Sequence, residues 1–192
     1  GAAAVLGGVC KIAATLDDQG RIIQLAKFHE LLYGEVDGTI TDRMTRLDAF
    51  IQGAKFDAHL SSAIVREMWE KWLFLASLGG ITCLMRGTIG EIAAAPGGAD
   101  FARQLIAEIA AIVKACSHSP SDALLAEIGA ALTAKGSPLT SSMYRDLQTG
   151  SPIEADEIIG DLLARGQAKG VQTPLIAALY AHLCVYQNRL NA

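Results

Sequence analysis

The pattern of apolar and polar positions changes character near residue 37. Before that point the chain holds three short apolar runs, over residues 5–15, 21–26 and 28–34. The first two are separated by a turn-forming stretch at residues 16–20, and β-branched or aromatic residues occur in all three. Runs of this kind are typical of antiparallel strands. The first 36 residues therefore predict an antiparallel β meander, which would be marginally stable unless it packed against another element.

After residue 37 the spacing of apolar residues is helical. The spacing predicts helices over 41–53, 61–85, 99–116, 121–135, 140–147, 153–169 and 174–189. From Trp69 onward the segment 61–85 is apolar on nearly every face, which indicates central burial. Gly79-Gly80 interrupts this segment and favours a bend or a close approach of another group. The fold class predicted is mainly α, with a small β part at the front (1–36) and a helical domain behind it (37–192).

Composition narrows the class of protein. Of the 192 residues, 51% are hydrophobic and 19% are charged, which is a globular balance. The net charge is −4 and no run of Lys or Arg occurs, so nucleic acid and anionic membranes are poor candidate partners. The most apolar run, 72–85, is shorter than the ~20 residues that a membrane span needs, and it is expected to be a core helix.

The cysteines and histidines are scattered along the chain. None of the four cysteines stands in a Cys-x-x-Cys pair. This usage is typical of reduced thiols in a cytoplasmic protein, and no metal site is expected.

Lys71 is the first candidate for chemistry. It is a charged residue directly before the apolar run of the most apolar predicted helix, where a lysine could transfer a proton. The alternative is a surface ion pair with Glu67 one helical turn earlier.

Two further clusters lie in the second half of the chain. Ser141-Ser142 precedes an apolar residue, so a hydroxyl could cap a helix or bind a ligand. Ser151-Pro152-Ile153-Glu154 fits a capping box with Glu154 at its third position, which needs no substrate to explain it.

In this order the three clusters resemble the C-terminal domain of ketopantoate reductases (2-dehydropantoate 2-reductases). The family shows a lysine that opens a long apolar helix, a Ser-Ser-Met-x-x-Asp signature, an Ile-Glu helix start, a helix with a glycine and a Gly-Val-x-Thr-Pro stretch. The matching positions are Trp69-Glu70-Lys71, Ser141 to Asp146, Ile153-Glu154, Gly160 and Gly170 to Pro174. Residues 5–16 and 20–22 resemble the closing strands of the family's nucleotide-binding domain.

The resemblance implies a two-domain enzyme. Its N-terminal Rossmann domain would bind NADPH, and its all-helical C-terminal domain would be similar to that of 6-phosphogluconate dehydrogenase. Residues 1–36 would then be the β remnant of the Rossmann domain, and residues 37–192 the helical domain for substrate binding and dimerisation. The family reduces ketopantoate to pantoate in pantothenate and coenzyme A biosynthesis. Without the Rossmann domain, the 192 residues alone are expected to be inactive.

The resemblance also implies roles for single residues. Lys71 would be the general acid, Glu154 would position Lys71 and the substrate oxygens, and Ser142 and Asp146 would bind the substrate. No cofactor-binding residue or metal ligand is expected in this chain, and the expected partners are a 2-oxo acid, the chain's own Rossmann domain and, in a homodimer, a second copy.

One departure from the family concerns the substrate. Many members carry asparagines one and two turns after the lysine, facing the substrate, where this chain has Leu75 and Gly79. The alternatives are therefore a reductase of another branched 2-oxo acid, or a helical dimerisation module without catalysis of its own.

Overall fold

The computed structural model describes Gly1 and residues 4–190, which form two compact units that divide after Lys71. The first unit holds β1 (Gly7–Leu16), β2 (Ile22–Gly34), α1 (Asp42–Ile51), β3 (Asp57–Leu60) and the first turns of α2 (Ile64–Met85). The second holds the rest of α2, α3 (Ile89–Ala94), α4 (Gly98–Ala115), α5 (Asp122–Leu132), α6 (Ser142–Thr149), the π-helical turn Asp156–Gly160, α7 (Asp161–Ala168) and α8 (Pro174–Leu190). The fold class is confirmed as a helical domain preceded by a small sheet. The domain boundary at residue 36 stays a prediction.

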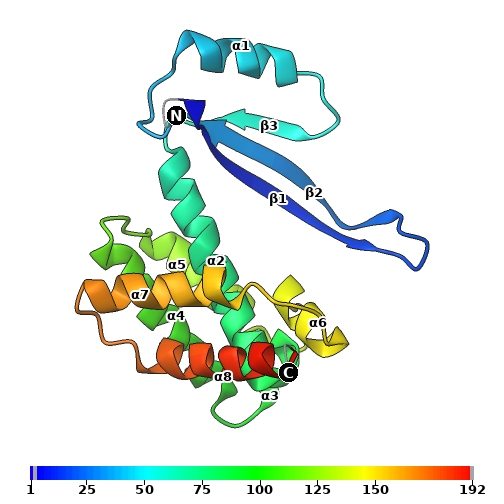
Figure 1. Ribbon diagram of the computed structural model, residues 1–192, viewed down its shortest axis with the longest axis vertical. Coiled ribbons are helices and arrows are strands. Elements are labelled where there is room, and N and C mark those ends of the chain that lie inside the picture. Colours follow the sequence, from blue (N-terminus) through cyan, green and yellow to red (C-terminus); the bar gives the residue numbers. More distant parts are fainter. Residues whose placement is uncertain (2–3, 191–192) are drawn as a thin grey trace. The chain divides into compact units, whose positions relative to one another are not determined.

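The sheet of the first unit has the order β1-β2-β3. β1 and β2 form a long antiparallel hairpin, and Figure 1 shows them side by side. The runs predicted as two strands, 21–26 and 28–34, form the single strand β2. The third strand is β3, which pairs in parallel with Glu30–Tyr33 of β2 and was not predicted from the sequence. Its four residues, Asp-Ala-His-Leu, are too few and too polar to give a strand signal.

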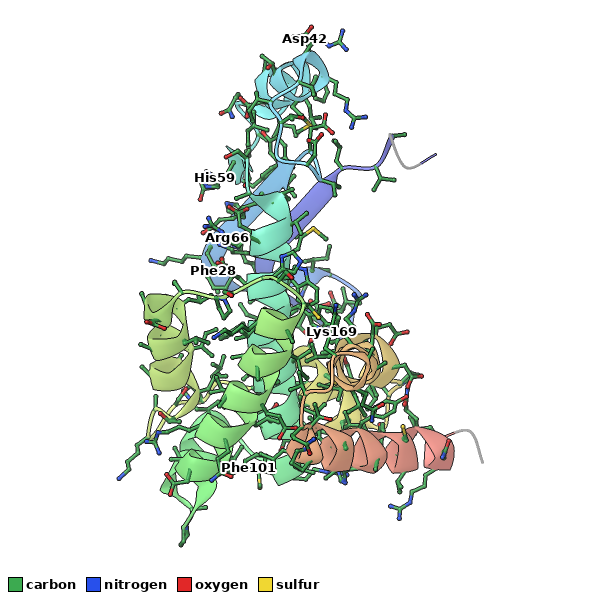
Figure 2. The ribbon with its side chains drawn as sticks, turned by 90° about the vertical axis from the view of Figure 1, so that its left-hand side faces the viewer. Phe28, Asp42, His59, Arg66, Phe101 and Lys169 are labelled. Carbon is green, nitrogen blue, oxygen red and sulfur yellow. The ribbon has the colours of Figure 1, made fainter. Side chains whose placement is uncertain are left out.

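A small apolar cluster and a hydrogen-bond network around Glu35 help to hold the first unit together. Val9, Leu32 and Ile64 are its buried core. The carboxylate of Glu35 accepts hydrogen bonds from the hydroxyl of Thr41, which is the N-cap of α1, and from the guanidinium of Arg43. These donors lower the pKa of Glu35 to about 2, with the hydrogen bonds of Arg43 as the first cause. Figure 2 labels Asp42, the first residue of α1.

In the helical unit residues 76–83 of α2 are all buried, which confirms the predicted central burial of this segment. The helix α4 packs against α3, α5, α7 and α8, and its stripe of Leu105, Ile109 and Ile112 is fully buried. Figure 1 shows α7 and α8 crossing the unit one above the other, and Figure 2 marks α4 by Phe101 and the end of α7 by Lys169. The helix α3 was not predicted; Thr88 and Glu91 form a capping box at its start. Within the part of the chain that the structure describes, none of the helices combines the length and apolar character that a membrane span requires.

Candidate functional site

Lys71 is half-buried and lies in the first unit. Its Nζ donates a hydrogen bond of 2.7 Å to the carbonyl oxygen of Cys10 on β1. Among the described residues it forms no ion pair with Glu67, whose Oε2 is buried without a hydrogen-bond partner. The alternative of a surface pair between these two residues is therefore wrong. An ammonium has three donors, so the bond to Cys10 leaves donors for a substrate oxygen.

The two adjacent serines have different environments. Ser141 is buried and is the N-cap of α6: its Oγ accepts the amide of Tyr144 at 2.9 Å and shares a 2.9 Å hydrogen bond with the hydroxyl of Thr82. Ser142 is the next residue, the first of α6, and it is exposed. The capping interpretation is therefore confirmed for Ser141, and Ser142 is the hydroxyl accessible to a ligand.

Asp146 is one helical turn after Ser142, so the two side chains share a face of α6. The residue is partly buried. Its backbone carbonyl accepts the amide of Ser151 at 2.9 Å, and Gly150 between them adopts the left-handed conformation that ends α6. This C-cap ties the end of α6 to the segment that carries Glu154.

Glu154 is exposed between two buried neighbours, Ile153 and Ala155. The predicted capping box is wrong. The amide of Ser151 donates to Asp146, and the helical turns begin only after Glu154, with no side-chain cap at Ala155. The carboxylate of Glu154 is thus not used by the helix start, which leaves it able to serve a ligand.

Side chains from distant helices hold this segment on both sides of Glu154. On the near side, the hydroxyl of Tyr186 donates to the carbonyl of Ser151 at 2.8 Å, and the Nε2 of Gln187 donates to that of Ile153 at 3.2 Å. On the far side, the indole Nε1 of Trp72 donates to the carbonyl of Ile158 at 2.9 Å. We call residues 151–158 with these bonds the clamped segment. Its partners were missed by sequence reasoning, because they come from α2 and α8 and no local spacing reveals them.

Burial keeps two titratable groups near Ser141, Cys83 and His182, uncharged at neutral pH. Burial raises the pKa of the Cys83 thiol to about 12, and the charge of Asp146 acts in the same direction. Burial also lowers the pKa of His182, and the cation of Arg86 adds to this. Neither group therefore competes with the exposed polar residues as a charged ligand-binding group at neutral pH.

The position two turns after Lys71 is closed by packing. Gly79 is buried, and a Cβ on it would lie 2.7 Å from Cε of Met143. Leu75, one turn after the lysine, is 37% exposed. An asparagine at position 75 would have open space, whereas one at position 79 would require Met143 to move.

Taken as a set, Lys71, Ser142, Asp146 and Glu154 comprise an ammonium, a hydroxyl and two carboxylates. Three of them lie on α6 and the clamped segment, which form one continuous stretch of the helical unit. The expectation that Lys71 joins them around one cleft stays a prediction. Such groups can bind the polar end of a small acid and transfer a proton, and none of them is a phosphate cradle.

Residues 63–187 match the family model described as ketopantoate reductase PanE/ApbA C terminal. An uncharacterized oxidoreductase, YkpB, of Bacillus subtilis is 32% identical over 183 residues, which are 95% of this chain and 60% of that protein. A 2-dehydropantoate 2-reductase of Nostoc is 25% identical over 183 residues, 93% of this chain and 57% of its own length. The chain thus spans about three fifths of these relatives.

The fold is similar to that of a solved structure. The crystal structure of 2-dehydropantoate 2-reductase from Methylococcus capsulatus superimposes with a TM-score of 0.81 at 24% identity, over 97% of this chain and 59% of that one. At this level of identity the likeness shows the fold alone. The match of residues 63–187 to the family model covers more than half of the chain, and the chain therefore belongs to the ketopantoate reductase family.

Proposed function

We propose that the full-length protein is an NADPH-dependent reductase of a 2-oxo acid, with ketopantoate as the first candidate substrate. The observation that carries the proposal is the exposed carboxylate of Glu154 on a backbone that is held at Ser151, Ile153 and Ile158. A charged side chain on a rigid backbone is suited to positioning a substrate. In this proposal the chain supplies the substrate side of the active site, and its own nucleotide-binding domain supplies the cofactor side.

Each polar residue then has a separate task. When bound, the nicotinamide cofactor supplies the hydride that reaches the ketone carbon. The ketone oxygen gains negative charge in the same step, and the ammonium of Lys71 stabilises this charge and gives up its proton to the oxygen. Ser142 and Asp146 hold the polar groups of the acid, and Glu154 orients the lysine and the substrate oxygens.

The partners follow from this proposal. The substrate is a small 2-oxo acid, and neither nucleic acid nor a membrane takes part. A homodimer formed through the helical unit is the assembly we propose, and light scattering of the full-length protein at several concentrations would measure it.

The test is the rate of NADPH oxidation by the full-length protein with ketopantoate. Lys71→Met is expected to lower kcat by roughly 100-fold to 10,000-fold, the usual contribution of a general acid. Lys114→Met, on the exposed face of α4, is the matched control and is expected to keep the wild-type rate. A Lys71→Met protein that stays within a few-fold of the wild-type kcat would contradict the role of Lys71.

A second candidate is a reductase of a branched 2-oxo acid without a hydroxyl. Leu75 and Gly79 favour it, because neither side chain can donate a hydrogen bond and Met143 closes the space beside Gly79. The comparison is between ketopantoate and 3,3-dimethyl-2-oxobutanoate, which is ketopantoate without its hydroxyl. A ratio of kcat/KM of ~10⁴ or more in favour of ketopantoate would show that other residues bind the hydroxyl and would reject the second candidate.

A further inference from the structure

Trp72 connects α2 to the clamped segment through its indole ring. The ring N–H donates to the carbonyl of Ile158 at 2.9 Å. The guanidinium carbon of Arg165, from α7, lies 5.5 Å from the centre of the ring, which is the geometry of a cation–π contact. Arg165 is in turn bonded to Asp161 at 3.1 Å. The indole is therefore fixed both at its edge and at its face.

The carbonyl that Trp72 binds belongs to the π-helical turn Asp156–Gly160. Such wide turns are rare in helices and are found frequently at functional sites, because they change the direction of the residues beside them. The turn is also bonded to Tyr180 of α8, whose hydroxyl donates to the carboxylate of Asp156 at 2.7 Å. Gly160 makes room for that ring: a Cβ on it would lie 2.9 Å from a ring carbon of Tyr180. The π turn is thus held between α2 and α8.

The π turn lies shortly after Glu154 in the chain, so a residue that holds the turn also affects the position of Glu154. Glu154 is two residues before the turn and is exposed, while its neighbours Ile153 and Ala155 are buried. A regular α-helix in place of the π turn would rotate the preceding residues about the helix axis. The carboxylate of Glu154 therefore leaves the backbone in a direction that depends on the turn.

We propose that Trp72 is a positioning residue: its indole N–H holds the π turn at Ile158 and so fixes the direction of the Glu154 carboxylate. The inference rests on the proposed function, in which Glu154 orients the reacting groups. Trp72 itself contacts neither substrate nor cofactor in this proposal, and it acts only through the backbone of the clamped segment.

The experiment is a double-mutant cycle in the full-length enzyme. Trp72→Phe removes the N–H and keeps an aromatic face for Arg165. It is expected to lower kcat by roughly 10-fold to 100-fold, the size of effect that a small misplacement of a catalytic group produces. In the background of Glu154→Gln, the same Trp72→Phe change is expected to lower kcat no further, because the carboxylate that it misplaces is already absent.

Tyr33→Phe is the matched control, since it also removes one hydrogen bond from an aromatic ring, the 2.6 Å bond to Asp48. Its effect is expected to be the same with and without Glu154→Gln. Trp72→Leu serves the same cycle if the phenylalanine variant does not fold.

The outcomes separate this inference from the proposed function. If Glu154→Gln is as fast as wild type, the role of Glu154 is wrong and both fall. If Glu154→Gln is slow but the losses from Trp72→Phe and Glu154→Gln multiply, Trp72 does not act through Glu154, and only this inference is overturned.

Discussion

Glu35 shows how one residue couples the stability of the first unit to pH. Its pKa in the folded chain is about 2, below its ordinary value of 4.5, because Arg43 and Thr41 donate to the charged form. A carboxyl with a lowered pKa contributes stability above its unfolded pKa, and this contribution is lost as the pH falls toward the folded pKa. The stabilisation by Glu35 is thus complete above pH 4.5 and fades between pH 4.5 and about 2.

We therefore expect Glu35→Gln to lower the free energy of unfolding at neutral pH, and the difference from wild type to disappear as the pH approaches 2. Urea unfolding of the full-length protein at a series of pH values measures this difference. Glu127→Gln, at an exposed position of α5, is expected to change little at any pH. A difference for Glu35→Gln that is the same at pH 7 and pH 3 would show that the ion pair is not its source.

Leu75 is the residue at which the substrate preference could be changed. Leu75→Asn places a hydrogen-bonding group where the side chain is 37% exposed. If the proposed function holds, it should raise kcat/KM for ketopantoate over the hydroxyl-free acid by roughly 3-fold to 10-fold, the worth of one neutral hydrogen bond. Gly79→Asn should lower the melting temperature and leave this preference unchanged, because Met143 fills the space. An increase in preference from Gly79→Asn alone would contradict the packing argument.

At the scale of elements, the first amides of α8 donate their hydrogen bonds to a side chain of another helix. The carboxylate of Glu108 on α4 accepts the amides of Leu175 at 3.2 Å and Ile176 at 2.8 Å. These amides belong to the first turn of α8 and have no partner within the helix. Glu108 thus serves as a cap although it lies far away in the sequence.

Glu108→Ala is expected to lower the free energy of unfolding by ~1–2 kcal/mol, the usual cost of losing a helix cap. Glu108→Gln keeps an acceptor oxygen and should cost less. Thermal unfolding followed by circular dichroism measures both, with Glu127→Ala on α5 as the exposed control. Equal melting temperatures for Glu108→Ala and the control would mean that water replaces the carboxylate without loss.

Most helices of the chain could be predicted from the sequence, because a long stripe of apolar residues at helical spacing, such as that of α4, is a strong signal. The elements that were missed are short or depend on distant partners. β3 is formed because β2 offers it a pairing edge, and α3 has only six residues. The π turn was invisible because its sequence, Asp-Glu-Ile-Ile-Gly, fits an ordinary helix, and its partners Trp72 and Tyr180 are distant.

The same limit applies to the candidate site. The resemblance identified Ser142 and Glu154, but the sequence alone favoured capping roles for both clusters. The capping interpretation holds for Ser141 and fails for Glu154, since only the folded chain shows that the amide of Ser151 is used by Asp146. The spacing of residues in the sequence identifies candidates, but only the hydrogen bonds of the folded chain show which of them cap a helix and which are left for a ligand.

At the scale of the whole molecule, Cys83 reports on the integrity of the helical unit. It is fully buried in α2, and its thiol pKa is raised to about 12, so a reactive thiolate is almost absent at neutral pH in the folded protein. Unfolding removes both protections.

In a full-length protein with Cys10, Cys116 and Cys184 replaced by serine, labelling of Cys83 by a thiol reagent is expected to follow unfolding of the helical unit. Mass spectrometry after timed labelling in increasing urea would measure the rate. Labelling of Cys83 within minutes in the absence of urea would show that the unit opens locally around α2.

The π turn also has a consequence for the evolution of the chain. An α-helix advances about 100° per residue, since it has 3.6 residues per turn. A π turn takes up one more residue than the α-helical turn that it replaces, so deleting one residue between Asp156 and Gly160 would restore a regular helix with the flanking residues close to their present directions. Closing the turn into an α-helix with all five residues kept would instead rotate the residues before it by a large part of the roughly 100° that one α-helical residue spans. In the evolution of the chain, a one-codon deletion within the turn is therefore expected to preserve the orientation of Glu154 better than substitutions that close all five residues into an α-helix.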